Sequence, residues 1–239
     1  MWIICKKEWQ QFFNSLTGYI AIVIFLLLNG LFMFVFPDTS LLSFGYASLN
    51  GFFALCPLIL LLLVPTITMR SFSDEYKSGT FELLKTMPLT PRQIVWGKFS
   101  GALIVVLIAL IPTIIYAWSI QHLSTIGGVD TGSTIGSYIG LLILGAVFTA
   151  IGICASSFTN NTVVAFIIAA FAGYFLFNGF DAISKLPVFK GMDYYIEMLG
   201  INFHYNSISR GVIDTRDMIY FFLVICVALL ITQRNIAKK

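Results

Sequence analysis

The sequence is poor in charge, because only 10% of its 239 residues are Asp, Glu, Lys or Arg. Soluble domains carry about 25% charged residues, so this composition excludes a soluble globular domain. The net charge of +3 is dispersed and forms no basic stripe of the kind that nucleic-acid binding needs. A hydrophobic content of 58% predicts an integral membrane protein that contacts the lipid bilayer and no nucleic acid.

Catalytic and metal-binding patterns are missing as well. The two histidines, His122 and His204, stand alone, and neither an HExxH nor a GxSxG motif occurs. The four cysteines lie far apart in apolar surroundings without a CxxC pair, which favours buried free thiols. We therefore predict no catalytic residue, no metal site and no cofactor bound by this chain.

The chain also lacks a nucleotide site and an ion relay. The nearest approach to a phosphate loop, Gly97-Lys98, has Arg92 in place of its first glycine and Phe99 in place of Ser or Thr. Acidic residues are essentially absent from the long apolar stretches, so a proton or sodium relay has no carrier. Any energy for transport must therefore come from a partner.

What the chain does contain is apolar stretches long enough to cross a membrane. A helix of about 20 residues crosses the hydrocarbon core, and helices satisfy their own backbone groups in lipid. We predict one all-α domain over residues 1–239, whose six transmembrane helices lie at about 19–36, 49–69, 99–120, 135–157, 162–180 and 218–232.

The residues before the first span have an apolar face of their own. That face predicts an interfacial amphipathic helix over residues 2–16, formed by Trp2, Cys5, Trp9, Phe12, Phe13 and Leu16. A simple extension of the first span is the alternative. The apolar run is too long for a signal peptide and no small-residue cleavage site follows it, which favours a retained anchor.

The distribution of cations predicts the orientation. With the N-terminus inside, ten of the fourteen Lys and Arg residues fall on the cytoplasmic side, and the loops 37–48 and 121–134 hold none. The positive-inside rule therefore places both termini in the cytoplasm. The remaining four lie in an outer loop, 181–217, whose aromatic residues predict short interfacial helices or a partial re-entry.

Residues 70–98 form a charged segment between the second and third spans. Gly79 is placed to end one short helix, and Pro88 and Pro91 to stop the next. The resulting helix, break and helix would expose Glu75, Tyr76 and Glu82. Apolar residues mixed with these charges favour a docking element over an ordinary solvated loop.

Glycine pairs predict close helix contacts at two places. Gly97 and Gly101 form one small-xxx-small pair, and Gly132, Gly136 and Gly140 form a run of two more. Such spacing serves contacts within one subunit or between subunits, and the sequence leaves both open.

The charged segment resembles the permease subunits of type 2 ABC exporters. The resemblance rests on Glu75, Gly79-Thr80, Glu82-Leu83-Leu84, Pro88-Leu89 and Gly97-Lys98, together with Lys7-Glu8 before the first span. It implies a coupling loop that meets a separate ABC ATPase, present in two copies that carry ATP and Mg. The ATPase-coupling residues that it implies are Glu75, Tyr76, Gly79, Thr80 and Glu82.

The run HYNSISRGVIDTRDMIYFFLV, from His204 to Val224, resembles the gliding-motility-associated Gld F-type permease family of Bacteroidota. This likeness implies export or mechanical work across the inner membrane, with a Gld G-type membrane subunit or a second permease copy as partner. A conduit between the membrane subunits would be lined around Pro57, Phe171 and Phe175, although these residues also suit a lipid-facing or core position. The alternatives are a non-transporting scaffold of a motility or secretion machine, or a permease of a related copper-maturation or sodium-export system.

Overall fold

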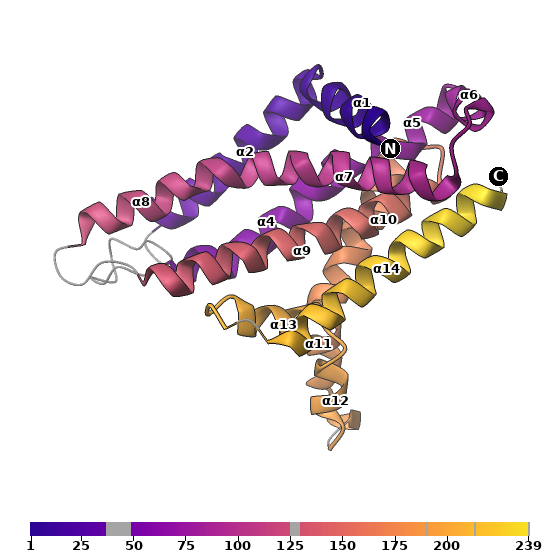
Figure 1. Cartoon of the computed structure of the whole chain (residues 1–239). Helices are drawn as coiled ribbons and strands as arrows, with labels where there is room; N and C mark the ends of the chain where they lie inside the picture. The colour runs from indigo at the N-terminus through magenta and orange to yellow at the C-terminus, as the bar shows by residue number, and fades with distance from the viewer. Residues whose placement is uncertain (37–48, 125–129, 190, 213, 239) are drawn as a thin grey trace.

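The computed structural model describes residues 1–36, 49–124, 130–189, 191–212 and 214–238, and their regular elements are all helical (Figure 1). The prediction of an all-α protein with six membrane-crossing helices is confirmed. These helices cover Leu16–Phe34, Asn50–Lys77, Pro91–Leu123, Thr131–Phe158, Thr162–Ser184 and Thr215–Lys238. The predicted outer loop 37–48 lies outside the described residues.

The third span begins well before the predicted residue 99, as helix α7 (Pro91–Leu110). Thr90 and Gln93 form a capping box, in which each side chain accepts a hydrogen bond from the other residue's backbone N–H. Pro91, which we expected to stop a helix, starts this one, because the first turn needs no N–H from that position. A 3-10 turn, η1 (Ile111–Thr113), then joins α7 to α8 (Ile114–Leu123) at Pro112.

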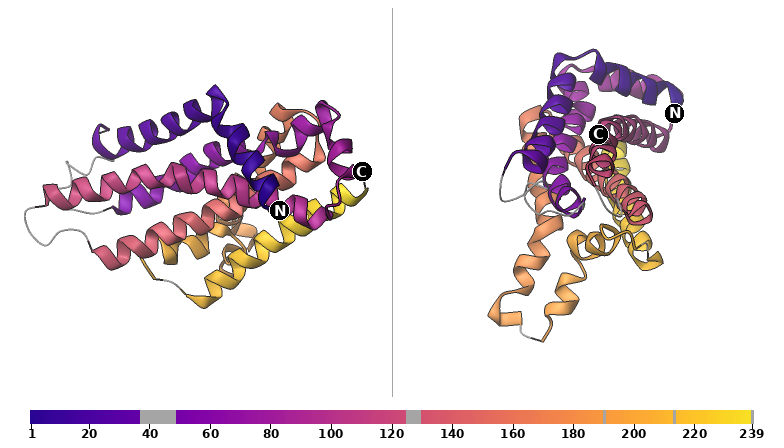
Figure 2. Two further views of the ribbon diagram at one scale, coloured as in Figure 1. Left: turned by 45° about the horizontal axis from the view of Figure 1, so that its top comes forward. Right: turned by 90° about the vertical axis from the view of Figure 1, so that its left-hand side faces the viewer.

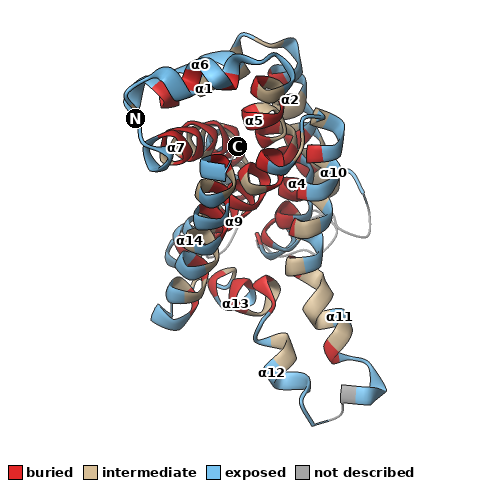
Figure 3. Ribbon diagram, turned by 90° about the vertical axis from the view of Figure 1, so that its right-hand side faces the viewer, coloured by how far each residue is buried: buried red, intermediate tan, exposed pale blue. Residues whose placement is uncertain are grey.

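Helix α9 (Thr131–Phe158) forms the centre of the bundle. It packs against α4 (Asn50–Thr68), α7, α10 (Thr162–Tyr174) and α14 (Thr215–Lys238). Small residues let these neighbours approach closely; a Cβ at Gly152, for example, would lie 2.9 Å from Thr68 Cβ. The buried residues accordingly gather on α4, α7 and α9 (Figure 3).

Helix α1 (Trp2–Phe13) is separate from α2 (Leu16–Phe34) and meets it at a sharp angle, so it does not extend the first span (Figure 1). It packs on α7 at the predicted glycine pair. A Cβ at Gly97 would lie 2.9 Å from Ile4 Cβ, and one at Gly101 would lie 2.8 Å from Glu8 Cβ. This pair therefore serves a contact within the chain.

The fifth span ends with α11 (Phe180–Ser184), and the segment after it folds into the short helices η3 (Pro187–Phe189), α12 (Asp193–Glu197) and α13 (Ile201–Ile208). Helices α11 and α12 form a hairpin that projects from the bundle (Figures 1 and 3). Helix α13 returns to pack on α9, where a Cβ at Gly136 would lie 2.9 Å from Gly211 Cα. This second glycine run also serves packing within the chain.

Both termini lie at one end of the bundle, near α5 (Arg70–Lys77) and α6 (Thr80–Thr86). The other end is formed by α8 and the start of α9 (Figures 1 and 2). This arrangement puts the charged segment and the cation-bearing termini on one side.

Candidate functional site

The residues between the second and third spans fold into an elbow (residues 70–90), in which α5 and α6 are joined at Gly79. Gly79 has φ = 70°, a left-handed conformation that glycine adopts without strain, and the predicted break lies there. Three aromatic rings hold the two helices together, because Phe81 packs edge-to-face against both Phe72 and Tyr76. Packing these rings inward leaves the other side of α6 facing outward.

The joint between α4 and α5 is formed by a side chain of α9. Ser156 Oγ donates a hydrogen bond to the Met69 carbonyl (3.0 Å) and accepts one from the Phe72 N–H (3.0 Å). A hydroxyl inserted into a helix ladder in this way is a common cause of a kink. The elbow is therefore tied at its base to the central helix.

Of the predicted coupling residues, the elbow exposes Gly79, Thr80 and Glu82, whereas Tyr76 is half-buried and Glu75 is buried. The expectation that Glu75 is exposed was wrong. Its carboxylate points into the protein because Lys7 Nζ lies 2.8 Å and Lys98 Nζ 3.0 Å from Glu75 Oε1.

These contacts belong to a charge cluster of Lys7, Glu8, Glu75 and Lys98. The Lys98 ammonium, 1% exposed, lies 2.6 Å from Glu8 Oε1, bonds the Ser71 carbonyl and lies 4.8 Å from the centre of the Phe72 ring. The charge cluster contains two ammonium and two carboxylate groups, so it is electrically balanced. It fixes α1, α5 and α7 to one another, a role that sequence patterns did not reveal.

The exposed side of α6 combines apolar and charged groups. Leu83 is 64% exposed, Met87, the extended residue that follows the last turn of α6, is 53% exposed, and Glu82 and Lys85 are exposed near them in the sequence. Exposed apolar residues at i and i+4, rimmed by charge, are typical of a surface that binds another protein. The described residues contain no group of three or more His, Cys, Asp or Glu side chains able to hold a metal.

The three residues of the expected conduit lie in different environments. Pro57 is buried inside the chain, whereas its neighbours Ala54 and Leu58 are exposed. Phe171 and Phe175 stack on each other, with centroids 6.4 Å apart, on an exposed face of the fifth span. On the second span, the exposed surface is therefore formed by the neighbours of Pro57 and not by Pro57 itself.

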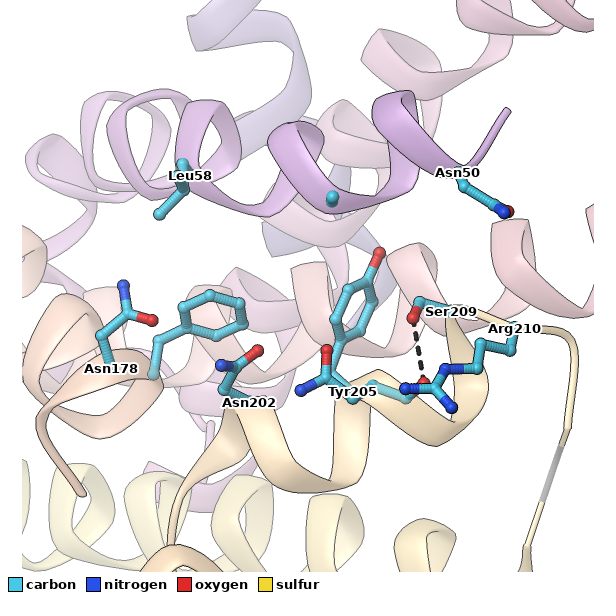
Figure 4. Close-up of a pocket in the computed structure, with 10 residues that line it drawn as sticks. Asn50, Leu58, Asn178, Asn202, Tyr205, Ser209 and Arg210 are labelled. Atoms are coloured by element: carbon cyan, nitrogen blue, oxygen red, sulfur yellow. Dashed lines mark hydrogen bonds between the residues drawn. The ribbon is translucent and has the colours of Figure 1, made fainter. Parts of the chain in front are cut away.

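A cavity of about 450 Å³ opens between α4, η2 (Phe175–Gly179) and α13 (Figure 4), and we call it the outer cavity because the predicted orientation would place it toward the outer side. In Figure 4, Asn50 and Leu58 approach it from α4, and Asn178, Asn202 and Tyr205 from the opposite side. Tyr205 donates a hydrogen bond to the Phe53 carbonyl (2.8 Å), and burial raises the pKa of its phenol well above the usual value. Sequence patterns alone had not pointed to this cavity.

A buried histidine fixes the outer segment to the last span. His204 Nδ1 lies 2.7 Å from Asp217 Oδ1, and Nε2 lies 2.9 Å from the Met198 carbonyl. Because a carbonyl only accepts hydrogen bonds, Nε2 carries a proton. His204 therefore links α13 to α14, a contact that its isolated position in the sequence did not reveal.

Two comparisons with known proteins bear on this chain of six candidate spans. The comparison with curated proteins gave no match. A family model described as "ABC-2 family transporter protein" matches residues 2–232, which is nearly the whole chain. The chain belongs to the ABC-2 transporter family, whose members are multi-pass membrane subunits of ABC transporters.

Proposed function

We propose that this permease subunit receives the work of ATP hydrolysis from a separate ABC ATPase through the elbow. The observation that carries the proposal is the exposed side of α6 and its C-terminal end, where Leu83 and Met87 leave more than half of their surface exposed. Glu82, Thr80 and Gly79 border that surface and would contact the ATPase. ATP and Mg would be bound by the ATPase.

The charge cluster would give this docking surface its mechanical connection. Glu75 would transmit movement of the elbow from inside the protein, because its contacts with Lys7 and Lys98 join the elbow to α1 and α7. Tyr76 would act beside it through its contact with Phe81. A displacement of α6 would therefore move three helices together.

The assembly we propose has two ATPase copies and a second membrane subunit, either a Gld G-type protein or another copy of this chain. It would lie in the bacterial inner membrane with both termini in the cytoplasm. This orientation is supported by the cation count and by the position of both termini beside the elbow. A conduit at the contact between membrane subunits would involve the surface beside Pro57 and the stacked Phe171 and Phe175.

The process we propose is gliding motility, served by export or by mechanical work. The support is the likeness of residues 204–224 to the Gld F-type family. In this chain the segment includes the second part of α13 and the first part of α14, and its Tyr205, Asn206, Ser209 and Arg210 line the outer cavity. A scaffold that moves no substrate and a copper-maturation or sodium-export permease are the competing functions.

Leu83→Asp tests the docking surface. We expect the change to reduce the amount of ATPase that copurifies with the tagged chain about tenfold, because truncating an apolar anchor at an interface costs upwards of ~1.4 kcal/mol. The measurement is the ATPase activity and the protein stoichiometry of the purified assembly.

Leu123→Asp is the matched control, since Leu123 is equally exposed (62%) at the opposite end of the bundle. It should leave copurification unchanged. Equal losses in the two variants would contradict docking at the elbow. A wild-type chain that copurifies with no ATPase would favour the scaffold.

A further inference from the structure

The outer cavity has the dimensions of a ligand site. Its volume of about 450 Å³ falls within the range of about 300–1,000 Å³ that is common for small-molecule pockets. It lies in the half of the bundle away from the termini, and α4, η2 and α13 form its walls (Figures 1 and 4).

Polar groups without partners face this cavity. The side-chain amides of Asn178, Asn202 and Asn206 and the guanidinium of Arg210 make no hydrogen bond within the described part of the chain. Each amide both donates and accepts, whereas the guanidinium only donates and carries a positive charge. Among the described residues, no acidic side chain lines the cavity to neutralise Arg210. The cavity is therefore equipped for an anion that also carries hydroxyl or similar hydrogen-bonding groups.

The opposite wall changes from polar to apolar along α4. Asn50, Ala54, Leu58 and Leu62 follow one another at four-residue spacing on its exposed face. The first three line the cavity, and Leu62 continues the same face one turn deeper. A ligand with a polar head at the Asn50 end and an apolar tail along Leu58 and Leu62 would match this gradient.

The local backbone of the fifth span supports a binding role. Residues 175–179 form a π-helical segment, and two of them, Phe177 and Asn178, line the cavity. A π-helical turn is less favourable than continued α-helix and occurs frequently at functional sites, where it redirects side chains. Here it lies at the wall where Asn178 faces α13.

We infer that the outer cavity binds the head group of an anionic amphiphile, with Arg210 on the negative charge and Asn178, Asn202 and Asn206 on its hydroxyl groups. The tail would lie along the exposed face of α4. Binding needs neither ATP nor a partner subunit, so this inference goes beyond the proposed coupling and can fail independently of it.

The test uses the full chain in neutral detergent and a fluorescent short-chain phosphatidylglycerol, with the same phosphatidylcholine derivative as the zwitterionic comparison. Fluorescence anisotropy should show saturable binding of phosphatidylglycerol and much weaker binding of phosphatidylcholine. Arg210→Gln should weaken phosphatidylglycerol binding about tenfold, the loss of roughly one charge-assisted hydrogen bond. Asn206→Ala, on an exposed position of α13, should weaken it several-fold.

Arg216→Gln is the matched control, because it removes the same charge from an exposed residue that does not line the cavity. It should bind as the unaltered chain does. Equal effects of Arg210→Gln and Arg216→Gln, or equal affinities for the two lipids, would overturn the inference. If glycerol phosphate displaced the labelled lipid at the concentrations at which the lipid itself binds, the tail would contribute nothing to binding. That result would overturn the assignment of an amphiphile, because a soluble anion would be the ligand.

Discussion

Lys98 is the most deeply buried charged side chain among the described residues, and its surroundings determine what its loss would cost. Lys98→Met would leave Glu8 without its ammonium partner and Glu75 with only Lys7. Breaking a buried ion pair on one side costs about 3–5 kcal/mol, because an uncompensated charge stays buried. We expect a loss of that size in the free energy of unfolding, measured by denaturant titration in micelles.

Lys7→Met is the comparison, since the Lys7 side chain is 50% exposed and also contacts Glu75. Exposed ion pairs contribute about 0–1 kcal/mol. A chain that loses no more stability with Lys98→Met than with Lys7→Met would show that the charge cluster does not hold the three helices together.

The charge cluster also marks the limit of sequence analysis at the residue scale. The role of Gly79 can be predicted from its neighbours in the sequence, because a glycine between two short helical patterns predicts a left-handed break. The role of Glu75 cannot be predicted in this way, since its partners are distant in the sequence. Lys7 lies 68 positions before it, and Lys98 lies on another span. Neighbouring residues alone suggested an exposed carboxylate.

At the scale of single elements, the contact of α13 with α9 depends on Gly140. A Cβ there would overlap Ile208 Cγ2 and would lie 3.3 Å from Ile208 Cβ. Gly140→Ala should therefore destabilise the chain by about 1–3 kcal/mol through overpacking, despite the better helix propensity of alanine. The measurement is the free energy of unfolding, together with protease sensitivity of the outer segment.

Gly51→Ala is the control, because a Cβ at Gly51 meets nothing within 4 Å. Lying in α4, it should be neutral or slightly stabilising. Ile208→Ala should offset part of the cost of Gly140→Ala. Independent, additive losses from these two changes would contradict a direct contact between them.

The elements themselves differ in how far the sequence predicts them. Long apolar runs predict the six spans, since length and hydropathy are local properties. The start of α7 was also encoded locally, in Thr90, Pro91 and Gln93, but the prolines were taken as stops. The π-helical segment at 175–179 has no comparable signature, because its backbone pairing depends on packing against other helices.

At the scale of the whole molecule, the proposals for the elbow and the outer cavity both assume that the termini lie in the cytoplasm. With the four native cysteines replaced by alanine, Gln10→Cys, exposed on α1 and outside the proposed docking surface, should react with a membrane-impermeant maleimide only after cell lysis. Tyr194→Cys, 59% exposed on α12, should react in intact cells. Mass-shift labelling measures both, and the reverse pattern would contradict cytoplasmic termini and an inward-facing elbow.

The contacts of α1 have a consequence for biosynthesis. Glu8 leaves the ribosome 90 residues before Lys98, the partner that neutralises it. Because membrane spans are made from the N-terminus onward, α1 must remain at the water-facing surface while the first two spans insert. The surface of α7 on which α1 packs, at Gly97 and Gly101, forms only once the third span is in place. Helix α1 is thus synthesised before the six spans but reaches its final position only after the third of them.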